Sequence, residues 1–194
     1  MEGVNTLKKN ASEKSGIQGI VTFTKYKIVG KRAEEIDKEL KTATNISQAR
    51  YNELVRELNE LCEVTAVRKE NLCVLSGRSI FARLLVGDTT YTGEINYGAL
   101  GSNSTAVDAS DTTLNTEVAR KLYATRVRSG AQVTLDFYYS KSDTNGTYEE
   151  FGCFIDGSAS ADSGQLFNRL LTGGWTKSAS EAMTVSVQIN INAA

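Results

Sequence analysis

The sequence contains no histidine and no proline, and both absences narrow the candidate functions and folds. Histidine is the usual general base of serine and cysteine hydrolases and the commonest side-chain ligand of zinc and iron. Its absence therefore argues against the most frequent hydrolase and metalloenzyme sites. Without proline, the turns have to be made by glycine, asparagine, aspartate and serine.

Cysteine is scarce and irregularly spaced. Cys62, Cys73 and Cys153 are odd in number, far apart and flanked by apolar residues. The pattern fits neither a disulfide framework nor a zinc site. We predict buried, reduced thiols that act as small hydrophobic side chains.

Long apolar runs and an excess of one charge are also missing. The longest apolar runs, such as residues 84–86, are far short of a membrane span, and residues 1–9 lack the apolar core of a signal peptide. Because 22 Lys and Arg balance 23 Asp and Glu, no overall field attracts nucleic acid or an anionic membrane. We expect neither as a partner. We also expect the protein to be kept in the cytoplasm until it joins its assembly.

The composition suits one domain with a small appendage. A chain of 194 residues with 40% hydrophobic content can bury a core of ordinary size. Residues 1–16 have no periodic apolar face, so we predict a flexible or partner-ordered N-terminal arm. Residues 17–194 are predicted to form a single domain.

Alternation of apolar and polar residues predicts a chain dominated by β-strands. Its clearest instance is residues 132–155, where two alternating segments flank the turn sequence at 142–146 and predict a β-hairpin. With six or seven strands, we predict an α+β, mainly β fold: an antiparallel β-sandwich with short corner helices. The other strands are expected at residues 17–29, 71–75, 94–100, 122–128 and 183–191.

Residues 31–63 have a different pattern and predict an inserted helical hairpin. Ser47 is a plausible cap for the second helix, and both helices carry narrow apolar stripes beside densely charged faces. We expect the hairpin to project and, with the arm, to contact neighbouring subunits. The alternative is that it lies on the sheet. Deleting it should leave a folded monomer in the first case and an unfolded chain in the second.

Three shorter helical segments are predicted at the corners of the sheet. Ser76 can cap a helix that carries Ile80 and Leu84 inward. Asp111 or Thr112 can cap a helical turn that directs Leu114 and Val118 inward, and residues 166–171 form an apolar segment ended by two glycines.

Several carboxylates resemble acid–base pairs or calcium ligands, but their spacing argues against both. Glu149 and Glu150 are adjacent, so on a strand they point to opposite faces. Asp108 and Asp111 lie where a loop and a cap are expected, and solvated carboxylates are the simpler interpretation. Two more, Asp156 and Asp162, match no calcium-loop spacing.

The glycines at 98, 101, 173 and 174 form no phosphate-binding loop. An aromatic cluster could stack on sugars or bases, although a packed sheet face explains it more simply. We therefore predict no catalytic, cofactor-binding or metal-binding residues and no enzyme activity. The cluster consists of Tyr138, Tyr139, Tyr148 and Phe151, with Lys141 nearby.

Five segments carry a family resemblance: residues 75–85 (LSGRSIFARLL), 97–106 (YGALGSNSTA), 111–121 (DTTLNTEVARK), 164–171 (GQLFNRLL) and the closing alternation at 183–191. In their order and character they resemble a group of tailed-bacteriophage virion proteins, often labelled tail or tail-fibre proteins and found near baseplate or neck components. The likeness covers about residues 71–192. Residues 31–63 look like an insertion into the shared core.

The resemblance implies a non-enzymatic structural component of a phage virion, in the tail, baseplate or neck. Such a protein would contact other virion proteins and copies of itself, and we expect a homo-oligomer. A capsid decoration or head-fibre attachment protein is the first alternative. A carbohydrate-binding module that uses the aromatic cluster is the second.

Overall fold

The computed structural model describes residues 16–192, in which three helices and nine strands are present. The predicted arm lies outside the described residues, except for Gly16, which opens the first strand. The strands are β1 (Gly16–Lys27), β2 (Glu63–Cys73), β3 (Ile95–Gly101), β4 (Glu117–Leu122), β5 (Thr125–Ser129), β6 (Gln132–Tyr139), β7 (Gly146–Ile155), β8 (Gln165–Lys177) and β9 (Glu181–Asn192); the helices are α1 (Lys31–Thr42), α2 (Gln48–Leu61) and α3 (Leu75–Leu85).

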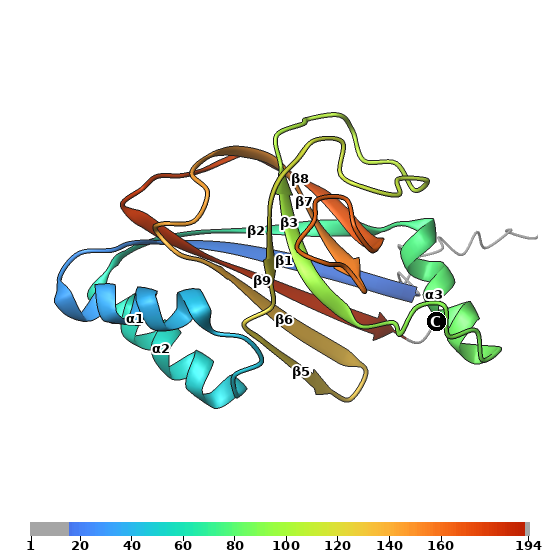
Figure 1. Cartoon of the computed structure of the whole chain (residues 1–194), viewed down its shortest axis with the longest axis horizontal. Coiled ribbons are helices and arrows are strands. Elements are labelled where there is room, and N and C mark those ends of the chain that lie inside the picture. The colour runs from blue at the N-terminus through green and yellow to red at the C-terminus, as the bar shows by residue number, and fades with distance from the viewer. Residues whose placement is uncertain (1–15, 193–194) are drawn as a thin grey trace, which may run out of the picture.

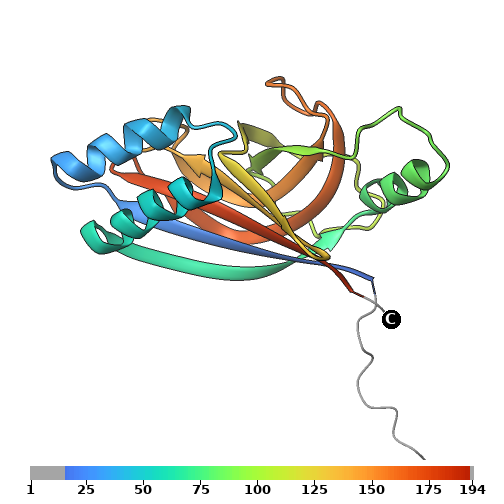
Figure 2. The ribbon, with the colours of Figure 1, turned by 90° about the horizontal axis from the view of Figure 1, so that it is seen from below.

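All nine strands belong to one antiparallel sheet in the order β4-β3-β7-β8-β2-β1-β9-β6-β5. The predicted α+β, mainly β class is confirmed. The sheet curls strongly, so that its two halves face each other like the layers of a sandwich (Figures 1 and 2). Within residues 16–192, strand pairing connects the two halves only where β2 meets β8, through Leu72 and Cys73.

The main core fills the space between the two halves. The ring of Phe151 on β7 packs edge-on against Phe23 on β1 and Phe137 on β6, with centroids 5.7 and 6.1 Å apart. On the same side, the Tyr139 hydroxyl donates a 2.9 Å hydrogen bond to the carbonyl of Gly98 on β3. A Cβ at Gly98 would lie 2.8 Å from the Phe137 ring, so only glycine allows β3 to approach β6 this closely.

The helical hairpin is present with the predicted cap, because Ser47 accepts a hydrogen bond from the backbone of Arg50 at 3.2 Å. It does not project. Leu40, Leu54 and Leu58 are completely buried in a second core, on the outer face of the sheet, which Tyr26 and Tyr138 also enter. The structure therefore favours the alternative in which the hairpin lies on the sheet.

The predicted hairpin at residues 132–155 is wrong in its pairing, although both strands exist. β6 pairs with β5 and β9, whereas β7 pairs with β3 and β8 in the other half of the sheet. The connection between them crosses from one half to the other. Asp37 on α1 fixes its start by accepting hydrogen bonds from Ser140 and from the backbone of Lys141 at 2.9 and 3.1 Å.

The predicted helix at residues 166–171 is wrong, because this segment is part of β8. The register with β7 shifts there: Asn168 pairs with Cys153 and Leu166 with Phe154, which leaves Phe167 as an extra residue. This bulge interrupts the alternation and places apolar residues at helix-like spacing. Two differences raise the number of strands above the predicted six or seven. The segment predicted as a helix belongs to β8, and the predicted strand 122–128 is divided between β4 and β5.

Two other details of the predicted helices are also corrected. Residues 111–116 form no helical turn; Leu114 is buried as expected, but Val118 lies on β4 and is 47% exposed. α3 begins at Leu75, and its Ser76 donates to the carbonyl of Leu166 instead of capping the helix. Across residues 16–192, every helix is too short or too polar to cross a bilayer.

Candidate functional site

Two long connections, residues 102–116 and 156–164, lie together over one half of the sheet (Figure 1). A buried ion-pair cluster fixes the first connection. Arg169 of β8 is completely buried and donates to Glu150 on β7 and to Asp111 in the connection, both at 2.8 Å. Its guanidinium also donates to the carbonyl of Thr105 at 3.0 Å. One arginine therefore ties the connection to two strands.

Glu150 completes this cluster from the opposite side. Its carboxylate accepts backbone hydrogen bonds from Asn115 and Thr116 at 3.2 and 2.9 Å, in addition to the one from Arg169. Burial disfavours the charge on Arg169, but the hydrogen bonds with Asp111 and Glu150 outweigh it and raise the pKa of the guanidinium. Both carboxylate oxygen atoms of Glu150 are therefore occupied by protein donors.

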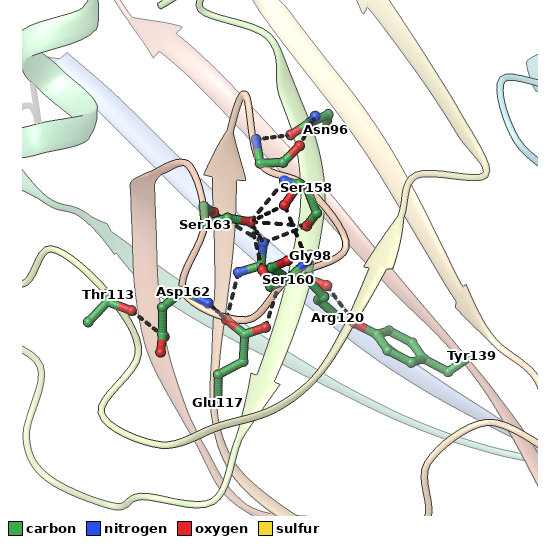
Figure 3. A network of polar contacts seen from close by, with 11 residues as sticks. Asn96, Gly98, Thr113, Glu117, Arg120, Tyr139, Ser158, Ser160, Asp162 and Ser163 are labelled. Carbon is green, nitrogen blue, oxygen red and sulfur yellow. Dashed lines mark hydrogen bonds and ion pairs between the residues drawn. The ribbon is translucent and has the colours of Figure 1, made fainter.

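A second ion pair fixes the connection at 156–164, as Figure 3 shows. Arg120 on β4 binds Glu117 through two hydrogen bonds of 2.6 and 2.7 Å, and the two side chains are only 4% and 2% exposed. The guanidinium also donates to the carbonyls of Ser158 and Ser163 at 2.8 and 3.1 Å. Its cation lies 4.7 Å from the centre of the Phe154 ring.

The two connections are also bound to each other. Thr113 in the first donates to the carboxylate of Asp162 in the second at 2.6 Å, and the backbone of Asp162 donates to Glu117 (Figure 3). Asn96 on β3 exchanges two 2.8 Å hydrogen bonds with the backbone of Gly157. We call this assembly of Glu117, Arg120, Glu150 and Arg169, with the loops that they hold, the loop clamp. Its charged side chains form hydrogen bonds with the backbone of both connections and thereby hold the two loops in place.

The loop clamp contains some of the carboxylates considered above, in a different combination. Glu150 and Asp111 meet around Arg169. This combination differs from the pairs Glu149 with Glu150 and Asp108 with Asp111 that were considered and argued against from the sequence. Asp108 instead accepts hydrogen bonds from Ser110, which lower its pKa. The prediction of solvated carboxylates is therefore wrong for Glu150, which is completely buried.

The other sequence candidates have structural partners. The carboxylate of Asp156 accepts hydrogen bonds from the backbone N–H and the hydroxyl group of Thr92. The carboxylate of Asp162 accepts one from the hydroxyl group of Thr113, so different residues engage the two carboxylates. Within residues 16–192, no group of three or more carboxylates and thiols has the geometry of a metal site. The aromatic cluster is packed, in agreement with the simpler interpretation of the sequence. Its members are all at most 1% exposed, which leaves them no face for a sugar; they are Tyr138, Tyr139, Tyr148 and Phe151.

The three cysteines are free thiols, as predicted. Cys73 and Cys153 are buried, and Cys62 is half-buried. Burial raises the pKa of all three and brings that of Cys73 to about 11. These thiols therefore remain protonated at neutral pH.

A polar groove of about 340 Å³ separates α2 from the outer face of the sheet. One of its lining residues is Asp136 on β6, which is 4% exposed and accepts hydrogen bonds from Gln48 at 3.3 Å and from Ser186. Burial raises the pKa of this carboxyl group. The groove surrounds it with amide and hydroxyl groups from α2, β1 and β9.

The end of the molecule around α3 exposes apolar side chains, and we call it the apolar end. Leu84, Leu85 and Val86 are 46%, 87% and 81% exposed. One helical turn before Leu85, Phe81 lines two adjoining grooves of about 250 and 460 Å³. Both grooves also include Ile191, which is 42% exposed. Figure 1 places this end opposite the helical hairpin.

Sequence reasoning missed the loop clamp, although one signal was present. Arg169 stands inside the apolar run at residues 166–171, where a charged side chain requires a buried partner. The partner could not be found from sequence, because Glu150 becomes its neighbour only through the β7–β8 pairing.

Comparison of the chain with protein-family models, with curated protein sequences and with solved structures found no match.

Proposed function

We propose that this chain is a non-enzymatic structural component of a tailed-bacteriophage virion, a tail, baseplate or neck subunit that works through protein–protein contacts. The family resemblance supplies the class of particle. The observation that carries the proposal is the apolar end, where Leu85 and Val86 are 87% and 81% exposed at the end of α3, the helix whose Phe81 lines a groove with Ile191.

Exposure of this kind favours association with a neighbouring subunit. Full burial of a leucine or valine side chain stabilises a complex by about 1.5–3 kcal/mol. Three successive apolar residues at the end of α3 therefore offer several kcal/mol to a partner that covers them. A neighbouring virion protein with an apolar surface is the partner that we assign to this end.

The loop clamp supports the same role, because a rigid surface loses little conformational entropy when it binds. Arg169 and Arg120 together fix both long connections, through buried ion pairs that link them to β4, β7 and β8. The ionised groups of the clamp are engaged with protein atoms, which suits a scaffold that presents loops.

The test is incorporation of the chain into particles. Cells infected with the phage that encodes the chain would express the wild type, the test variant Leu85→Asp or the control variant Val127→Asp. Val127 lies on β5 and is 41% exposed, so the control adds the same charge at another exposed apolar residue. Particles purified on a density gradient would be analysed by quantitative mass spectrometry.

We expect a fixed number of wild-type and Val127→Asp copies per particle and a loss of about tenfold or more for Leu85→Asp, since a buried charge costs several kcal/mol. Wild-type chain found only in the particle-free lysate would refute the proposed function. Equal incorporation of Leu85→Asp would show that the apolar end is not the contact.

A further inference from the structure

The strand β2 has an open edge. Residues from Glu63 to Asn71 pair with β1 on one side. On the other side, β8 pairs with β2 only at Leu72 and Cys73, so within residues 16–192 the segment 63–69 has no strand paired with it on that side. The backbone N–H and C=O groups that point away from β1 are therefore available to another strand.

This edge is most accessible over residues 63–68. Residues 63–66 are exposed in succession, although alternate residues of a strand point to opposite faces. Figure 2 shows β2 running below β1, with no strand drawn beneath it over most of its length. The segment (EVTAVRKEN) contains neither glycine nor proline and includes the β-forming residues Val64, Thr65 and Val67, so it is suited to pairing.

The charges along this edge are self-complementary. In a two-fold antiparallel pair, residues equidistant from the central residue lie opposite each other. A register centred on Ala66 places Glu63 opposite Lys69 of the second copy, twice, and opposes no like charges. A register centred on Arg68 would oppose two arginines, and one centred on Val67 would place Glu63 opposite Asn71.

We infer that the open edge of β2 pairs with the same edge of a second copy, antiparallel and centred on Ala66. The two nine-stranded sheets then join across a two-fold axis. The inference rests on the proposed role as an assembly subunit and deepens it by naming a second copy as one partner. It uses a surface separate from the apolar end at α3.

The experiment is sedimentation velocity of the full chain over a range of concentrations. Wild type should form a dimer of twice the 21.1 kDa chain mass. Ala66→Lys brings two lysines together at the two-fold axis and should weaken the dimer by about tenfold or more. Ala131→Lys, at an exposed alanine in the β5–β6 turn, adds the same charge elsewhere and should dimerise like wild type.

A charge exchange tests the register. Glu63→Lys and Lys69→Glu should each weaken the dimer, and the double variant should restore it. The side chain of Glu63 is 75% exposed and forms only a 3.5 Å ion pair with Lys27, so folding should not change. Hydrogen exchange of peptides covering residues 62–74 should slow as the dimer forms.

A wild-type mass of 21.1 kDa at every concentration would overturn the pairing, as would an Ala66→Lys dimer equal to that of Ala131→Lys. Assembly that survives Ala66→Lys but is lost in Leu85→Asp would also overturn it, while supporting the proposed function. A dimer that is lost in Ala66→Lys but kept in Ala131→Lys and Leu85→Asp supports the pairing, even if the chain were later found outside particles.

Discussion

Removing the charge of Arg169 should destabilise the protein more than any surface substitution. Arg169→Met keeps most of the side-chain length but leaves Glu150, which is completely buried, without its cationic partner. Breaking a buried ion pair from one side costs about 3–5 kcal/mol. A domain is usually stable by about 5–15 kcal/mol, so this one change removes a large share of the total.

The loss of unfolding free energy can be measured by urea unfolding, and the fall in Tm by thermal unfolding, both followed by circular dichroism. For a chain of this size, about 3–5 kcal/mol corresponds to a fall in Tm of about 6–20 °C. Arg56→Met is the matched control, because Arg56 forms an ion pair with Glu60 on the surface of α2 and is 65% exposed. Its expected cost is below about 1 kcal/mol.

The double variant Arg169→Met, Glu150→Gln separates the unpaired charge from the loss of packing. It should recover part of the stability lost in Arg169→Met, because no unpaired carboxylate remains in the clamp. Equal stability of Arg169→Met and wild type, within about 1 kcal/mol, would show that the clamp does not hold the fold as described.

Two further predictions concern the helical hairpin and the groove. Leu54→Ala, at a completely buried residue of α2, should cost about 2–5 kcal/mol, and Leu61→Ala, at a residue 47% exposed, should change the urea midpoint little; equal effects would contradict burial of the hairpin on the sheet. Burial raises the pKa of Asp136, so its protonated form stabilises the fold at low pH and this contribution is lost as the pH rises through the folded-state pKa. Asp136→Asn should therefore have a higher Tm than wild type at about pH 8 and a similar Tm at about pH 3; a difference independent of pH would refute this.

The sequence predicted elements best where a single rule decided the local structure. The helical hairpin begins its second helix at Ser47 as expected, and β1 and β9 lie where alternation placed them. The coarse class followed from the number of such strands. The packing of the hairpin could not be predicted, because its charged faces would suit a projecting hairpin as well as one on the sheet.

Other errors arose where long-range pairing overrode local pattern. The turn sequence at 142–146 suggested a hairpin, but it connects two halves of the sheet that each supply other neighbours. The bulge at Phe167 gave β8 the spacing of a helix. The loop clamp depends on the strand conformation of residues 165–177 and on their pairing with β7, because Arg169 and Glu150 meet only when β7 and β8 pair.

Cryo-electron microscopy of purified particles tests the central claim most directly. The account predicts this chain at a symmetric position in the tail, baseplate or neck, with Leu85 and Val86 covered by a neighbouring subunit. A particle whose density is fully explained by other proteins, or one in which the end of α3 faces solvent, would contradict it.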